Sequence, residues 1–169
     1  IGYYFQKNRR FVESRKKKLS ELSKLAVCVG PGNFTGIRTS LSAAKGIAFG
    51  INAELIGFNV FQIIASSQKK CSVIFSGSFN KFLIQSFDNG KAITDIRLIS
   101  EKQLANEVFK SKVRILGFQV NRSFENSAFY EDIQVLPIEN IMSLVSRSKE
   151  FNKSRAIPFY FSEPVLPSK

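Results

Sequence analysis

The sequence has no histidine and no tryptophan, and it has only two cysteines among its 169 residues. Without histidine, the chain by itself cannot form a Ser–His–Asp or Cys–His catalytic site or a histidine-ligated metal site. Cys28 and Cys71 lie in separate apolar runs without a Cys-x-x-Cys spacing, so we interpret them as buried free thiols. The few carboxylates are scattered, which argues weakly against phosphoryl-transfer and glycosidase chemistry.

Long hydrophobic segments are also missing. No window approaches 18 uninterrupted apolar residues, which excludes a transmembrane helix by sequence. The N-terminus has no basic-then-apolar signal pattern, so the expected location is cytoplasmic. The chain begins with Ile1, and we interpret it as lacking its natural beginning. Its length suits one sizeable core or two small lobes that share one.

Basic residues are abundant, and the formal net charge is +12. About half of that excess lies in residues 7–24, where Lys and Arg dominate. Such a segment could contact tRNA through its phosphates. It could equally be the solvated face of a helix. The sequence leaves both interpretations open.

Hydrophobic periodicity predicts an α/β chain with a mixed sheet. Strands are expected at 25–29, 54–58, 72–76, 82–87, 92–98, 113–118 and 133–136. Helices are expected at 3–14, 35–49, 60–67, 101–110 and 138–147. The Asn89-Gly90 pair predicts a tight hairpin turn, and Ser100 with Gln103 predicts a capping box. Thr35 is expected to cap the helix over 35–49, with Gly50 as its C-cap.

A glycine-rich loop joins the first strand to that helix. It consists of Gly30, Pro31, Gly32, Asn33, Phe34, Thr35 and Gly36, with Arg38 one turn into the helix. The spacing matches neither a P-loop nor the dinucleotide-binding glycine pattern. The helix N-terminus could still hold an anion near Arg38. Alternatively, the glycines shape a tight turn, Gly36 lets the helix pack on the strand, and Phe34 is buried.

The helix after this loop is rich in small residues. They are Ser40, Ser42, Ala43, Ala44, Gly46 and Ala48. Small side chains allow another backbone to approach closely, either the chain's own sheet or a second subunit. The residues alone do not decide between these two interpretations.

The loop and the helix together resemble one family, the TsaB (YeaZ) proteins. Residues 30–38 are similar to the family's run G-P-G-S-F-T-G-L-R, and Lys45, Gly46, Ile47 and Ala48 to its K-G-L-A. The resemblance implies the two-lobed ASKHA (actin/Hsp70/hexokinase-like) fold with mixed sheets. It divides the chain into an apparently incomplete N-terminal lobe, residues 1–68, and a C-terminal α/β lobe, residues 69–169.

The resemblance also implies a role in forming threonylcarbamoyladenosine in tRNA. It implies a non-catalytic subunit that binds a TsaD-like transferase, with a TsaE-like ATPase in the larger complex, and a homodimer is a further option. No cofactor is expected, except ATP at an interface with partner subunits. The expected partner interface comprises Ile37, Ser40, Leu41, Ala44, Lys45 and Ala48.

Departures from the family pattern point to a reduced member. The family's opening strand with its D-T-S turn is missing, residues 76–83 lack its acid and paired arginines, and Ser162 replaces an arginine in the tail. Two enzymatic alternatives remain: a nucleotide-dependent phosphotransferase of the same fold, and a protease. The protease interpretation lacks a nucleophile–base pair.

Overall fold

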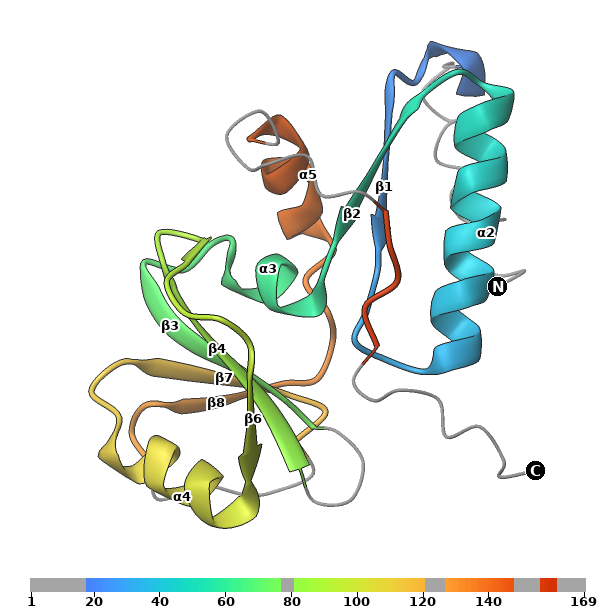
Figure 1. The fold of residues 1–169 in the computed structure, drawn as a ribbon. Helices are drawn as coiled ribbons and strands as arrows, with labels where there is room; N and C mark the ends of the chain where they lie inside the picture. Colours follow the sequence, from blue (N-terminus) through green and yellow to red (C-terminus); the bar gives the residue numbers. More distant parts are fainter. Residues whose placement is uncertain (1–17, 77–80, 121–126, 148–155, 161–169) are drawn as a thin grey trace, which may run out of the picture.

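The computed structural model describes residues 18–76, 81–120, 127–147 and 156–160, and Figure 1 shows two sheets side by side. The smaller sheet pairs β1 (Lys24–Cys28) with β2 (Glu54–Phe58) in parallel. Helix α2 (Phe34–Gly50) connects these strands and packs on one face of them. A short 3-10 turn, η1 (Leu19–Glu21), precedes β1.

The larger sheet has six strands. In chain order they are β3 (Lys70–Ser76), β4 (Lys81–Asp88), β5 (Lys91–Ala92), β6 (Arg97–Ser100), β7 (Arg114–Phe118) and β8 (Tyr130–Ile133). The spatial order is β5-β4-β3-β7-β8, and β6 also pairs with β4. Strand β3 is central: it is antiparallel to β4 and parallel to β7. The sheet is therefore mixed, as expected.

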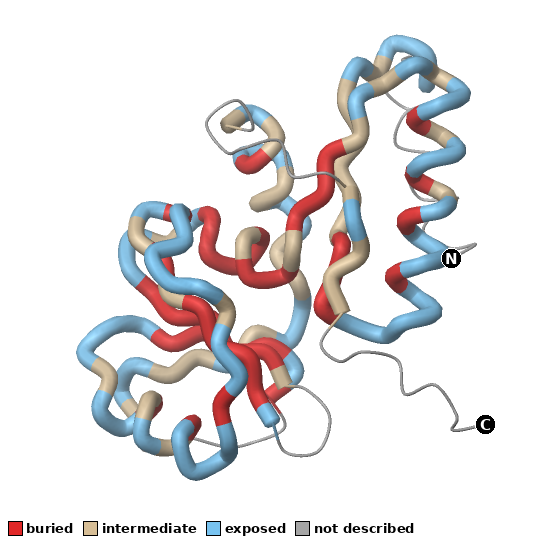
Figure 2. The backbone as a smooth tube through the Cα atoms, viewed as in Figure 1, coloured by how far each residue is buried: buried red, intermediate tan, exposed pale blue. Residues whose placement is uncertain are grey.

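Three further helices complete the layers. Helix α3 (Val60–Ala65) packs against β3, and α4 (Glu101–Lys110) packs against β4 and β6. Helix α5 (Glu139–Ser146) returns to the smaller sheet, where Leu144 shares a core cluster with Ile56 and Phe58. Figure 2 shows the buried residues concentrated along the inner strands and α3.

Several local predictions are confirmed. The strand over 54–58 has the expected bounds. Asn89 and Gly90 both have positive φ, at 48° and 73°, which is the hairpin geometry that an Asn-Gly pair favours. Ser100 and Gln103 form the expected capping box at the start of α4. The fold class, a mixed α/β architecture, is confirmed as well.

Two strand predictions need correction. The strand expected at 92–98 is interrupted, because Thr94 bonds to β4 through its side chain: its Oγ1 accepts from the Ser86 amide at 3.0 Å. The strand expected at 133–136 lies earlier, at Tyr130–Ile133. There the Tyr130 ring lies against Gly117, where a Cβ atom would overlap the ring. Apolar composition alone does not reveal that residues 130–133 pair with β7.

Some expectations stay predictions. The helix expected over 3–14 lies outside the described residues, and the lobe boundary after residue 68 stays a prediction. Across the described parts of the chain, none of the helices combines the length and apolar character that crossing a membrane requires.

Candidate functional site

The glycine loop lies where three segments of the chain meet. Val29 donates its amide to the carbonyl of Phe58 at 2.9 Å, and the carbonyl of Gly30 accepts from Val60 at 2.8 Å. The Val29 carbonyl accepts from Phe159 at 2.8 Å. The loop therefore ties β1 to the end of β2, to the start of α3 and to the segment 156–160.

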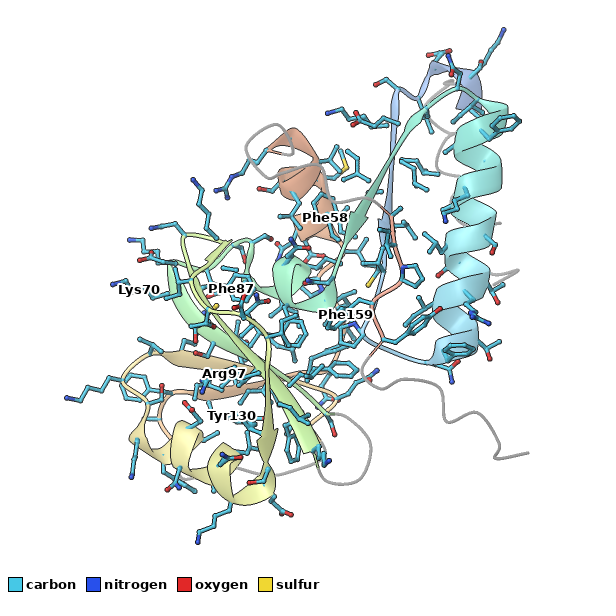
Figure 3. The ribbon with its side chains drawn as sticks, in the orientation of Figure 1. Phe58, Lys70, Phe87, Arg97, Tyr130 and Phe159 are labelled. Carbon is cyan, nitrogen blue, oxygen red and sulfur yellow. The ribbon has the colours of Figure 1, made fainter. Side chains whose placement is uncertain are left out.

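Gly30 is required by this arrangement. Its φ is +109°, which only glycine adopts at low cost. A Cβ atom at Gly30 would lie 2.5 Å from the Phe159 carbonyl oxygen. Phe159 itself packs against the main core cluster, and Figure 3 shows it between the two sheets. The backbone that approaches Gly30 is the chain's own segment, which favours the structural interpretation of the loop over a phosphate site.

The ends of helix α2 differ from prediction. Asn33, not Thr35, is the N-cap, because its Oδ1 accepts from the Gly36 amide at 3.0 Å. Gly50 is the last helical residue, and Ile51 is the C-cap. Asn52, at φ 55°, has the left-handed conformation that commonly follows the end of a helix.

Phe34 and Gly36 are both exposed rather than packed inside. The Phe34 ring instead contacts Tyr160, with ring centroids 4.9 Å apart. The Arg38 guanidinium lies 4.1 Å above the Phe34 ring, and its Nε donates to Tyr160 Oη at 3.1 Å. Arg38, the residue considered for anion binding, is thus held by two aromatic side chains of its own chain.

Four residues of the expected partner interface are buried within the chain. They are Ile37, Leu41, Ala44 and Ala48, which recur at helical spacing on the side of α2 that packs on β1 and β2. Figure 2 shows these buried positions along the side of α2 nearest the strands. Ser40 and Lys45 are exposed. The chain's own sheet therefore occupies most of the residues that the sequence suggested for a partner.

The opposite side of α2 is exposed, and we call it the outer face. It consists of Thr35, Thr39, Ser42, Gly46 and Phe49. A Cβ atom at Gly46 would meet nothing within 4 Å. Phe49 is 91% exposed. Helical spacing opposite the buried residues could have identified this face from the sequence, once the buried side of the helix was known.

Chemical groups elsewhere offer little reactivity. Burial raises the pKa of the Cys28 thiol. A hydrogen bond from the Gly30 backbone opposes this rise but is the smaller effect. Burial also raises the Cys71 pKa to about 11, with the nearby Arg114 charge opposing the shift. Raised pKa values leave both thiols protonated at neutral pH and therefore poor nucleophiles. Within the described residues, no group of three His, Cys, Asp or Glu side chains could hold a metal ion.

The Tyr130 phenol also has a raised pKa. Burial, followed by the charge and hydrogen bond of Asp132, raises its pKa to about 12. A polar pocket of about 360 Å³ lies between α4 and the sheet, near Ser72, Asn106 and Lys110. Its carboxylate, Glu107, is paired with Arg97 at 3.3 Å, so it is already neutralised.

Comparisons with known proteins agree with this architecture. Residues 9–159 match the family model described as TsaD: tRNA N6-adenosine threonylcarbamoyltransferase. A curated relative, "tRNA threonylcarbamoyladenosine biosynthesis protein TsaB" from Buchnera aphidicola subsp. Baizongia pistaciae, is 22% identical over 166 residues. That match covers 86% of this chain and 75% of the relative.

Two solved structures from Pseudomonas aeruginosa share the fold. One is described as YeaZ, with a TM-score of 0.69 and 16% identity, covering 92% of this chain and 83% of that one. The other is described as an uncharacterized protein with similarity to peptidase YEAZ, with the same TM-score and identity, covering 91% and 80%. The family model spans most of the sequence, and the chain therefore belongs to the TsaD family, in its TsaB (YeaZ) group.

Proposed function

We propose that this chain is a non-catalytic subunit that binds a TsaD-like threonylcarbamoyl transferase and supports threonylcarbamoyladenosine formation in tRNA. The relative from Buchnera is named for that pathway. The observation that carries the pairing is the outer face of α2, which is uncovered and built from small residues around one exposed phenylalanine.

The chemistry of the outer face suits close helix packing. The Thr39 hydroxyl donates to the Thr35 carbonyl at 2.7 Å. A partner that covers Thr39 therefore does not leave this hydroxyl without a hydrogen bond. Gly46 has open space around it, although glycine inside a helix costs about 1 kcal/mol relative to alanine. Close packing of a partner backbone against Gly46 in the complex would offset that cost. Burying Phe49 would add about 2 kcal/mol of hydrophobic stabilisation.

Co-expression with the TsaD-like protein of the same organism, followed by size-exclusion chromatography, tests the pairing. We expect one-to-one co-elution of the unaltered chain. Gly46→Arg should abolish co-elution while leaving the isolated chain folded and at least as stable as the unaltered chain, because arginine has a higher helix propensity than glycine. A bulky cation on the outer face blocks a partner, and a Cβ atom at position 46 has no neighbour within 4 Å in its own chain.

Two variants sharpen the test. Gly46→Ala should stabilise the isolated chain by about 1 kcal/mol yet weaken pairing, because only a closely packed partner backbone would meet the added methyl group. Lys102→Ala, on the exposed first turn of α4, is a control that should leave pairing unchanged. Co-elution of Gly46→Arg with the transferase would refute the outer face as the interface.

The proposal includes no cofactor bound by this chain alone, and places any ATP at an interface with partner subunits, including a TsaE-like ATPase. The engagement of the glycine loop with Phe159 and of Arg38 with Tyr160 supports this. Calorimetry of the isolated chain with Mg-ATP should give no binding heat. Measurable heat would favour the phosphotransferase alternative. The total absence of histidine supports setting the protease alternative aside.

A further inference from the structure

One end of the larger sheet gathers positive charge, and we call it the basic end. It carries Lys69, Lys70, Lys91, Lys112, Arg114 and Arg147. These residues are distant in sequence. Their meeting follows from topology, because the parallel strands β3 and β7 begin where the antiparallel strand β4 ends.

Hydrogen bonds join the members of this end. The Asn89 amide donates to the Lys69 carbonyl at 2.5 Å. Arg147, at the end of α5, donates to the Asn89 carbonyl at 3.3 Å. Arg114 donates to Gln68, one residue before Lys69, at 3.0 Å. Figure 3 shows Lys70 extending from the start of β3 away from the sheet.

Acidic residues neutralise only part of this charge. Asp88 pairs with Lys70 at 3.8 Å, and Glu131 pairs with Arg114. Lys69, Lys91 and Lys112 are exposed, and no ion pair with a carboxylate of the described chain involves them. Neighbouring strands are about 4.8 Å apart, so the cations from β5 across to β7 form a row roughly 14 Å long.

An exposed aromatic ring lies at the same end. Phe129 is 46% exposed, and its carbonyl accepts from Ile115, next to Arg114, at 2.7 Å. Cations in a row beside an exposed ring are the combination that binds unpaired nucleic acid, through phosphates and base stacking. A free anion or an acidic peptide would use the charges but would gain little from the ring.

We propose that the basic end binds the phosphate backbone of RNA, with Phe129 as the surface on which an unpaired base stacks. The inference rests on the proposed function, since tRNA is the RNA that such a complex would bring to this chain. The site is separate from the outer face of α2. The tRNA contact expected of the basic segment 7–24 stays a prediction.

Fluorescence anisotropy with a labelled, transcribed and unmodified tRNA tests the site on the full chain without a partner. Lys69→Gln/Lys91→Gln should weaken binding about tenfold at 0.1 M salt, and should lower the slope of log K against log salt by about 1 to 2. The control is Lys81→Gln/Lys102→Gln, which removes the same charge at the opposite end of β4 and on α4. It should leave the slope unchanged.

Phe129→Ala separates stacking from charge. It should weaken binding at least fivefold with an unchanged salt slope, because stacking of a base is worth about 1–3 kcal/mol. Thermal unfolding of each variant checks that the fold persists. Unchanged affinity in Phe129→Ala would remove the stacking role.

Equal losses in the two lysine variants would mean that net charge alone attracts the RNA, and would overturn the proposal. Binding of phosphatidylserine vesicles instead of tRNA, with loss in Lys69→Gln/Lys91→Gln, would assign the surface to membranes and would also overturn it. Gly46→Arg should bind tRNA normally. Failure of the unaltered chain to pair with a transferase, while its RNA binding persists, would refute the proposed function and not this inference.

Discussion

The backbone of Gly30 lies directly against the carbonyl of Phe159, at a distance that leaves no room for a Cβ atom. The adjacent Val29 carbonyl accepts the amide of Phe159. The glycine-rich loop, considered from the sequence as a possible anion site, thus holds the chain's own segment 156–160 in place, between the two sheets.

Gly30→Ala should therefore destabilise the fold. We expect a loss of about 2–4 kcal/mol, because a left-handed φ and a backbone overlap both oppose the methyl group. Gly32→Ala is the matched control: its Cβ would be 3.9 Å from Ile37, an ordinary contact, and should cost under about 1 kcal/mol. Urea unfolding measures both, and similar values would contradict the close approach of Phe159.

Replacing the residues at the start of α2 tests which one caps the helix. Asn33→Ala should cost about 1 kcal/mol, because the Gly36 amide loses its acceptor. Thr35→Ala should be neutral or slightly stabilising, since alanine has the higher helix propensity. Urea midpoints compare the two variants, and a larger loss from Thr35→Ala would restore the cap that the sequence suggested.

Charged substitutions should separate the two faces of α2. Ala44 is buried, so Ala44→Glu should cost about 3 kcal/mol or more through an unpaired buried carboxylate. Ser42 is on the outer face, and Ser42→Glu should change stability by less than about 0.5 kcal/mol. Thermal unfolding of the isolated variants measures this. A stable Ala44→Glu chain would mean that this side of α2 does not pack on the sheet.

Cys71 should make the fold sensitive to alkaline pH. Its folded pKa is about 11 against 9.0 for an ordinary thiol, so the unfolded chain loses its thiol proton first. The stabilising contribution is present below pH 9 and is lost as pH rises from 9 to 11. The difference in unfolding free energy between the unaltered chain and Cys71→Ala should shrink over that range.

Urea unfolding at pH 8, 9.5 and 10.5 follows this difference. Tyr130 contributes a similar loss between pH 10 and 12, but it is present in both proteins and cancels in the comparison. A difference that stays constant from pH 8 to 10.5 would show that the Cys71 thiol is not shielded by burial.

Local signals in the sequence were sufficient for the elements that local interactions control. The Asn89-Gly90 turn depends on the backbone preferences of two residues, and the capping box at Ser100 depends on contacts three residues apart. The glycine loop could likewise be located by its residues. Its partner, Phe159, could not be located, because that contact joins segments more than 100 residues apart.

The sequence by itself determined the α/β class, the family resemblance and the absence of histidine chemistry, since composition, motif and periodicity are properties of the chain alone. Only the tertiary structure decided which side of α2 is buried. The same small residues suit an inner or an outer contact, and the smaller sheet selects Ala44 for the inside while leaving Gly46 uncovered. It also assembled the basic end, because strand order brings Lys69, Lys91 and Arg114 together, whereas charge counts record only their number.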